Sequence, residues 1–457
     1  MDEKDIDLSD VNFSLAYSAL EDHPHSNIFI TGGAGTGKSL ILCSYYNRLT
    51  SRGKNVVVIS PTGVSAAILH DKGIPAMTIH SFFQLKPHPI FEKKVDMGKS
   101  KKKIISNLDF ILIDEISMVS PALFDHIAWL LNEVGFKGRV IFFGDPLQLS
   151  PVVRFEDQAV YDYYISREYI KKPGDIPQFY SGVYFKELAP EIFALTTIYR
   201  QENQEFASVL SRIRKGDETD EDLEYINERV ISSKEFYKDH KNALYLASTN
   251  SRVDYMNKRY EGLFEGKEHM TFVSESEGSL KKDTEEAITI YKGEQVMCIH
   301  NNSEEGYQNG TMGVVEDFDE DTVWVKTDDG TKKVGFETWV DYKVTFDKKT
   351  HTVETEECGR CRKIGCKPTF ASTIHKAQGL TLDAIYVDLS SSFIPIASVY
   401  LALSRVRTIE GLGLSRPIRR RDIKVDENVK DFYRSLATAS NTSLLSASEY
   451  ESGSSGN

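Results

Sequence analysis

Cysteine is scarce in this chain, with five unevenly spaced residues among 457. A chain of this size held together by disulfides would need more of them, so the sequence excludes a disulfide framework and fits a reducing compartment. Cys43 and Cys298 lie in apolar runs and are predicted to be core residues.

Long hydrophobic runs are also absent. No stretch approaches the roughly 20 apolar residues that a membrane span requires, and residues 1–5 lack the basic-then-apolar order of a secretory signal. We therefore expect a protein without a membrane partner that works in the cytoplasm or the nucleus. With 40% hydrophobic and 27% charged residues, the composition is that of an ordinary globular protein.

A surplus of positive charge is missing as well, because the formal net charge is −13. Binding of nucleic acid by overall charge is therefore disfavoured, and any such binding has to rely on a local groove. One basic segment, residues 86–103, carries seven lysines against Glu92 and Asp96. This segment is either a solvated face or a functional loop.

The most informative motif that is present reads GGAGTGKS and matches the G-x-x-x-x-G-K-[ST] phosphate-binding loop. Glycines let backbone N–H groups turn toward a phosphate at the start of a helix. Lys38 is predicted to reach the β- and γ-phosphates, and Ser39 is predicted to bind magnesium. The alternative is a glycine-rich turn before an ordinary helix. The predicted nucleotide-binding residues of the loop are Gly32, Gly33, Ala34, Gly35, Thr36, Gly37, Lys38 and Ser39.

Four apolar runs alternate with helical stretches, which is the pattern of a parallel sheet with crossover helices. The runs are residues 27–30, 56–60, 110–113 and 140–143. Each ends in polar residues, which should line one crevice at the carboxyl edge of the sheet.

Two of these strand ends carry predicted catalytic side chains. Asp114 is expected to hold magnesium and Glu115 to orient and deprotonate the attacking water. The alternative is an acidic pair at a strand end without catalytic role. Gln148, after the fourth run, is placed to sense the γ-phosphate.

A second α/β region is predicted from residue 195 onward, with strands at residues 243–247 and 384–389. It is interrupted by strand-like runs separated by the turn dipeptides Asn309-Gly310 and Asp329-Gly330, which predicts an inserted small antiparallel β-barrel. The runs are residues 294–300, 312–318, 322–327, 331–336 and 342–346. A helix is expected at residues 426–436, and the serine-rich residues 437–457 are expected to be disordered.

A cysteine cluster, Cys358-x2-Cys361-x4-Cys366, follows the predicted barrel strands, and His351 precedes it. Three thiolates and one histidine could hold a structural zinc ion. Reduced surface cysteines explain the same pattern, because the spacing beyond CxxC matches no familiar zinc finger.

The motifs, in their order along the chain, resemble those of superfamily-1 DNA helicases of the PIF-one type (petite integration frequency), which are related to phage Dda and RecD-like helicases. The resemblance covers residues 29–408. It rests on GGAGTGKS, PTGVSAA from Pro61, TIHSFF from Thr78, DEISM from Asp114, GDPLQLSPV from Gly144, TTIYRQ from Thr196, STIHKAQGLTLD from Ser372 and VYLALSRVRT from Val399.

The resemblance implies an α/β fold with two RecA-like P-loop domains built on parallel sheets, a small wedge insertion and the inserted β-barrel. The expected first domain is residues 1–190, with the wedge at residues 86–104. The second is residues 191–263 and 366–436, the barrel is 264–365, and the tail is 437–457. The implied activity is that of an ATP- and magnesium-dependent 5′-to-3′ DNA helicase. Its expected partners are single-stranded DNA and forked or tailed duplexes, which it would engage as a monomer in DNA repair, replication and telomere maintenance.

The resemblance also assigns roles to individual residues. Arg200 and Arg405 are expected to project from the second domain onto the γ-phosphate, where a guanidinium stabilises transition-state charge; the alternative for either is a surface ion pair. Gln378 and Gly379 are expected at the nucleotide. Phe82 could stack on a base or belong to the core. The implied single-strand contacts are Pro61, Thr62, Gly63, Thr78, His80, Ser81 and Phe82 on the first domain, and Ser372, Thr373, His375 and Lys376 on the second.

One departure from the family concerns nucleotide choice. Family members carry a glutamine upstream of the phosphate loop that reads adenine, and residues 1–28 contain none. Two other functions remain open at this point: a translocase that remodels RNA or DNA without processive unwinding, and a binding module that uses the nucleotide only as a switch.

Overall fold

The computed structural model describes residues 11–85, 97–151, 153, 155, 158–201, 203–283, 287–302, 304–307, 309–346, 353–391, 394–438 and 442–445. The chain divides into two compact units. The first comprises residues 1–200, 342–356 and 426–457, and the second comprises residues 201–341 and 357–425. Across the described residues, no helix has the length and apolar character to cross a bilayer.

The first unit is built on a seven-stranded parallel sheet with the order β20-β6-β1-β5-β4-β2-β3. Alternate residues of its central strands enter two cores, with Phe29 and Ile111 on one face and Ile28 and Leu112 on the other. Because both faces are covered, these strands are continuous apolar runs. The strands are β1 (Ile28–Gly32), β2 (Val56–Ser60), β3 (Ala76–Thr78), β4 (Phe110–Ile113), β5 (Arg139–Gly144), β6 (Glu191–Leu195) and β20 (Thr442–Leu445).

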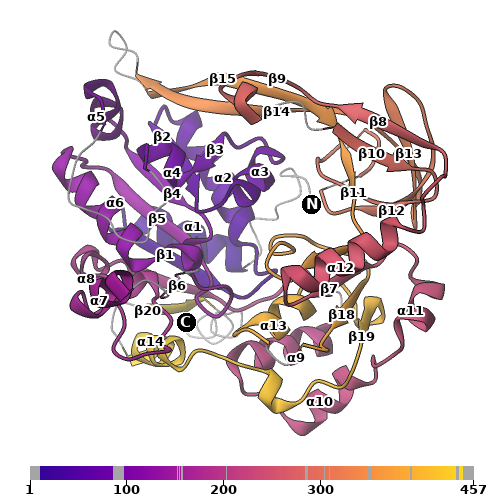
Figure 1. Cartoon of the computed structure of the whole chain (residues 1–457). Helices are drawn as coiled ribbons and strands as arrows, with labels where there is room; N and C mark the ends of the chain where they lie inside the picture. The colour runs from indigo at the N-terminus through magenta and orange to yellow at the C-terminus, as the bar shows by residue number, and fades with distance from the viewer. Residues whose placement is uncertain are drawn as a thin grey trace, which may run out of the picture. The chain divides into compact units, whose positions relative to one another are not determined.

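Helices connect and cover these strands (Figure 1). They are α1 (Val11–Asp22), α2 (Lys38–Ser51), α3 (Gly63–His70), α4 (Ile79–Phe83), α5 (Lys99–Ser106), α6 (Pro121–Glu133), α7 (Gln158–Ser166), α8 (Val183–Leu188) and α14 (Glu427–Thr438). The predicted wedge falls partly on α5, and its residues 86–96 lie outside the described part of the chain.

Two expectations about the first unit are wrong. Strand β6 was assigned to the second domain, but it pairs with β1 in parallel register, Ile28 opposite Glu191. The tail was expected to be disordered from residue 437 onward, but Thr442–Leu445 forms β20 and pairs with β6. Pairing with β1 leaves the other edge of β6 with unpaired backbone groups, so a short segment of low apolar content gains ladder hydrogen bonds there. Together with the predicted helix α14, these residues belong to the first unit.

The second unit contains a four-stranded parallel sheet with the order β17-β7-β18-β19. Its strands are β7 (Leu244–Ala247), β17 (Ala371–Thr373), β18 (Ile385–Asp388) and β19 (Leu412–Leu414), and β7 and β18 match the predicted runs. Its helices are α9 (Gln204–Lys215), α10 (Asp220–Asn227), α11 (Ser233–Asp239), α12 (Asn250–Glu261) and α13 (Ser398–Leu403).

The predicted insertion forms an antiparallel sheet with the order β16-β11-β12-β13-β14-β15-β9, and β8 and β10 pair separately. The predicted Asp329-Gly330 turn joins β13 to β14. Two predicted strands merge into the single long β14. The bounds are β8 (His269–Val273), β9 (Glu275–Gly278), β10 (Ala287–Tyr291), β11 (Gln295–Cys298), β12 (Met312–Phe318), β13 (Thr322–Thr327), β14 (Gly330–Phe346), β15 (Val353–Ile364) and β16 (Cys366–Pro368). The expected α/β fold with two parallel sheets and an inserted antiparallel sheet is confirmed.

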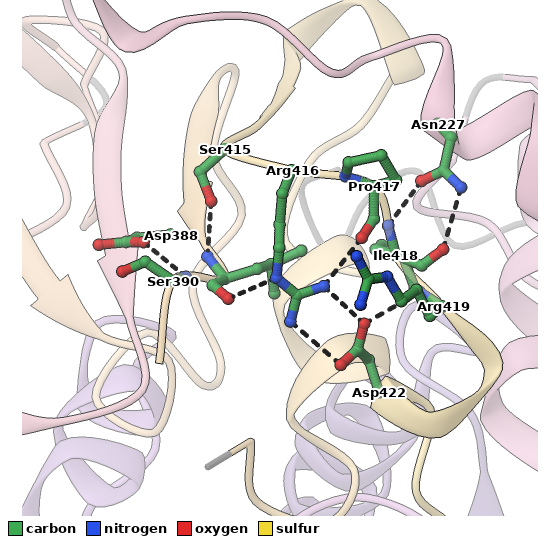
Figure 2. Close-up of polar contacts among 10 residues, drawn as sticks. Asn227, Asp388, Ser390, Ser415, Arg416, Pro417, Ile418, Arg419 and Asp422 are labelled. Carbon is green, nitrogen blue, oxygen red and sulfur yellow. Dashed lines mark hydrogen bonds and ion pairs between the residues drawn. The ribbon is translucent and has the colours of Figure 1, made fainter. Parts of the chain in front are cut away.

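The chain that leaves β19 is tied to the second unit by a polar network (Figure 2). Arg416 donates to Leu389 O at 2.8 Å and to both carboxylate oxygens of Asp422, at 2.7 and 3.1 Å. The side chain of Asn227 bonds the backbone N–H and C=O of Ile418 at 2.7 and 3.0 Å. Such paired bonds fix an irregular segment whose backbone groups have no sheet partner.

Candidate functional site

The phosphate loop lies between β1 and α2, as predicted. Gly37 is the N-cap of α2 with φ 88°, and Gly35 has φ 76°, a left-handed conformation that favours glycine. A Cβ at Gly35 would also lie 2.5 Å from Cβ of Arg200. Within the described residues no side chain caps α2, so its first N–H groups are available to an anion.

Lys38 lies folded over this loop. Its ammonium donates to Gly32 O at 2.7 Å and to Gly33 O at 2.8 Å, and the Thr36 hydroxyl donates to Gly33 O at 3.0 Å. These bonds hold a positive charge beside the N–H groups that begin α2. The loop therefore presents a fixed cation and a helix N-terminus to a bound phosphate.

Asp114 and Glu115 follow β4, two strands from β1 and separated from it by β5. Asp114 is 6% exposed, and burial raises the pKa of its carboxyl; the Glu115 N–H and the charges of Lys72 and Lys38 act in the opposite direction. Glu115 takes a left-handed conformation with φ 49°, and its N–H donates to Asp114 Oδ1 at 3.0 Å. A non-glycine residue held in this conformation is typical of functional sites.

Gln148 follows β5, which lies between the strands that carry Lys38 and Asp114. Its side-chain amide donates to Asp145 Oδ2 at 3.0 Å, and Leu147 N donates to Asp145 Oδ1 at 3.1 Å. Asp145 is completely buried. The sequence analysis quoted Asp145 within a motif but assigned it no role, whereas the structure makes it the residue that orients Gln148.

Arg200 belongs to the first unit, which corrects the expectation that it projects from the second. The reason is the position of β6: because β6 runs parallel to β1, the chain leaves it at the same edge as the phosphate loop. Tyr199 N donates to Gly35 O at 2.8 Å, which fixes this approach. Arg200 thus lies against the loop by way of its own unit.

Arg405 is 1% exposed, and its expected role at the γ-phosphate stays a prediction. Its guanidinium donates to Leu401 O at 2.9 Å, Leu380 O at 3.2 Å and Ser404 Oγ at 2.8 Å. Leu380 follows the predicted nucleotide residues Gln378 and Gly379 directly. Arg405 therefore supports the turn that carries them.

The first set of predicted nucleic-acid contacts lies at the ends of two paired strands. Ser60, the last residue of β2, is opposite Thr78, the last residue of β3. Thr62 caps α3 by accepting from Ser65 N, and Thr78 caps α4 by accepting from Ser81 N, both at 3.1 Å. Two helix N-termini thus begin side by side. Pro61, Gly63 and His80 lie in the same two turns.

Phe82 is a core residue, which is the second of the two alternatives that the sequence left open. It is 0% exposed and packs edge-on against Phe83 with ring centroids 4.8 Å apart. Lys101 Nζ lies 3.8 Å from the centre of the Phe82 ring, and burial lowers the pKa of this lysine to about 8. His80 is only partly buried, so of His80 and Phe82 it is His80 whose ring can stack on a base.

The second set of predicted nucleic-acid contacts lies on β17 and the turn after it. Thr373 is 6% exposed, and its hydroxyl accepts from Lys376 N at 3.2 Å, so it shapes the turn. Ser372 and His375 are partly exposed and Lys376 is exposed. Burial lowers the pKa of the His375 imidazole.

The described residues do not form the predicted zinc site. Cys366 is completely buried on β16 opposite Cys298 of β11. Cys361 lies opposite Ser276, the Cys358 thiol is 3.4 Å from Ser279 Oγ, and His351 is outside the described residues. No three histidine, cysteine or acidic side chains gather as metal ligands in the described ranges.

Two α/β units, one carrying a complete phosphate loop and an acidic strand end, define the class of P-loop motor proteins. The PIF1-like helicase family model matches residues 10–224 of this chain. The ATP-dependent DNA helicase Pif1 of Campylobacter jejuni is 24% identical over 90% of this chain and 95% of its own. A Bacteroides Pif1 structure in complex with ADP-AlF4 has a TM-score of 0.82 and 27% identity, covering 96% of this chain and 99% of that one. A second Bacteroides structure, with ADP-AlF3 and single-stranded DNA, has a TM-score of 0.63 and 28% identity, covering 94% and 97%.

Proposed function

We propose that this protein is an ATP-dependent DNA helicase that moves 5′ to 3′ along single-stranded DNA and separates duplexes ahead of it. One observation carries the proposal: Lys38, Gln148 and Asp114 follow β1, β5 and β4, three neighbouring parallel strands of one sheet. This places a phosphate-binding lysine, an amide and a carboxylate along one edge in a chain whose residues 10–224 match the PIF1-like helicase family model.

The phosphate loop binds the nucleotide in this proposal. Lys38 and the N–H groups that begin α2 neutralise the β- and γ-phosphates. Ser39 and Asp114 fit a magnesium ion, because they supply hydroxyl and carboxylate oxygens and Asp114 lies within the electrostatic influence of Lys38. Magnesium, when bound with the phosphates, would neutralise charge that develops during phosphoryl transfer. Two protein ligands are enough for magnesium, because its remaining ligands come from phosphates and water.

Glu115 and Gln148 act on the attacking water. Glu115 accepts its proton, and Gln148, held by Asp145 at 3.0 Å, orients it toward the γ-phosphate. Arg200 lies beside Gly35 and adds positive charge to the same loop. Arg405 positions Gln378 and Gly379 through its hydrogen bond to Leu380 O.

Single-stranded DNA is held by strand-end residues of each unit. In the first unit, the N-termini of α3 and α4 and the hydroxyls of Thr62, Thr78 and Ser81 suit phosphate contacts, and His80 suits stacking on a base. In the second unit, Ser372, His375 and Lys376 take the same kind of role. These contacts read no sequence. We propose that the protein acts as a monomer inside the cell on tailed or forked duplexes.

ATP hydrolysis measured with and without nucleic acid tests this function. We expect single-stranded DNA to stimulate hydrolysis strongly and RNA of the same sequence to stimulate it much less. Lys38→Ala should abolish turnover, because it removes the charge from the loop. Wild-type turnover in that variant would refute the site, and equal stimulation by RNA and DNA would favour a general remodelling translocase.

A further inference from the structure

The C-terminal segment is held against the first unit by aromatic packing. Phe432 of α14 stacks on Tyr180 with ring centroids 3.9 Å apart and planes within 6° of parallel. Val429 of the same helix is completely buried, and β20 then extends the sheet along β6. In Figure 1, the yellow α14 and β20 lie among the strands and helices of this unit. The segment is thus an integral part of the unit that carries the phosphate loop.

One side chain of this segment contacts the loop that follows β5, and a second is linked to that loop through Gln178. Asp426 accepts from the Gln178 side-chain amide at 3.1 Å, and the same amide donates to Ser150 Oγ at 2.9 Å. The Tyr433 hydroxyl lies 2.7 Å from Thr31 Oγ1 and 3.5 Å from Asp145 Oδ1. Tyr433 therefore contacts this loop at Asp145, and Asp426 is linked to Ser150 through Gln178.

The Tyr433 hydroxyl links two parts of the candidate site. Thr31 directly precedes the phosphate loop, and Asp145 is the acceptor that orients Gln148. Both are completely buried. If Thr31 donates to Tyr433 and Tyr433 donates to Asp145, each of the two hydroxyl donors has an acceptor. The Asp145 carboxylate then receives Tyr433, Leu147 and Gln148 together.

We propose that Tyr433 is a positioning residue for ATP hydrolysis, which fixes Asp145, and through it Gln148, relative to the phosphate loop. This inference rests on the proposed function. It predicts an effect on turnover more than on nucleotide binding, because Lys38 and the N–H groups of α2 do not depend on Tyr433. A hydroxyl that only positions Gln148 stabilises the transition state, in which Gln148 orients the attacking water, and not the bound nucleotide.

The test compares Tyr433→Phe with Tyr180→Phe in the full chain. The first variant removes the linking hydroxyl and keeps the ring. The second removes a hydroxyl from the same aromatic contact, and that hydroxyl has no hydrogen-bond partner among the described residues. For Tyr433→Phe we expect DNA-stimulated kcat to fall about three- to tenfold while KM for ATP changes less than about twofold. In a Gln148→Ala background, Tyr433→Phe should add no further loss.

Hydrogen exchange of the peptide that spans residues 144–151 gives a readout independent of turnover. Tyr433→Phe should speed exchange there, because Asp145 no longer holds the Leu147 N–H firmly, and Tyr180→Phe should not. If the wild type lacks ATPase activity but this difference is present, the proposed function fails, and only the link from Tyr433 to Asp145 is supported. If Tyr433→Phe matches Tyr180→Phe in both kcat and exchange, or lowers kcat as much without Gln148 as with it, the inference is overturned.

Discussion

Replacement of Arg405 by alanine should destabilise the second unit, because the guanidinium is buried and bonded inside it. Arg405 donates to Leu401 O, Leu380 O and Ser404 Oγ. Leu401 O keeps a partner, since Ser404 Oγ also donates to it at 3.0 Å. Two further bonds from a charged donor are lost, which costs about 3 to 6 kcal/mol at roughly 1.5 to 3 kcal/mol each. For a unit of this size, the expected drop in melting temperature is on the order of 10 °C.

The matched control is Arg407→Ala, two residues further along the chain. The Arg407 side chain is 42% exposed, and its ion pair with Asp383 is long, at 3.9 Å. Its removal should cost less than about 1 kcal/mol. The melting temperature of the full chain is measured for both variants. Hydrogen exchange in peptides of the second unit then shows whether that unit is the part destabilised. If Arg405→Ala unfolds at the temperature of Arg407→Ala, the buried network contributes nothing and Arg405 has to be reconsidered as a residue that serves only catalysis.

Three further predictions follow from burial. Burial raises the pKa of Glu294 from 4.5 to about 7, so the folded state binds its proton more tightly and loses stability as pH rises through this window. Glu294→Gln should therefore stabilise the chain more at pH 8 than at pH 5, as measured by urea unfolding, and an equal gain at both pH values would contradict the assignment. Phe82→Leu should cost about 1 to 2 kcal/mol of stability and leave affinity for single-stranded DNA unchanged, because this ring is a core residue; weaker binding at unchanged stability would restore its stacking role. His80→Ala should weaken that binding by at least about fivefold in a fluorescence titration, and unchanged affinity would remove His80 from the DNA path.

The sequence predicts best those parts of the fold that depend on local pattern. The four runs that became β1, β2, β4 and β5 are apolar on both faces, which only a covered parallel sheet explains. Strands β12 and β13 have the predicted bounds because a turn dipeptide and alternation fix them. The phosphate loop could be assigned because its glycines, lysine and serine are contiguous.

The parts that could not be predicted depend on partners distant in the sequence. Nothing in the residues of β6 indicates that it pairs with β1, so Arg200 was placed in the wrong unit. The residues of β20 lack a strong strand signal, and only the open edge of β6 orders them. Tyr433 had no signal at all, because the hydroxyl and carboxylate that it meets lie at the opposite end of the chain.

The motifs also do not indicate which of their side chains are buried. The sequence TIHSFF contains three aromatic rings that could meet a base, and only packing decides between them. Arg405 belongs to a motif whose arginine was expected at a phosphate, and its guanidinium also donates to backbone carbonyls of its own unit, which the motif does not indicate. A motif therefore fixes residue types more firmly than the directions in which their side chains point.

Strand separation on two partial duplexes, one with a 5′ single-stranded tail and one with a 3′ tail, tests the helicase proposal most directly. With ATP and magnesium, the protein should unwind only the 5′-tailed duplex. Glu115→Gln should bind ATP and DNA but unwind neither, because it lacks the base that activates water. Single-strand-stimulated ATPase without unwinding of either duplex, or unwinding that persists in Glu115→Gln, would contradict the account.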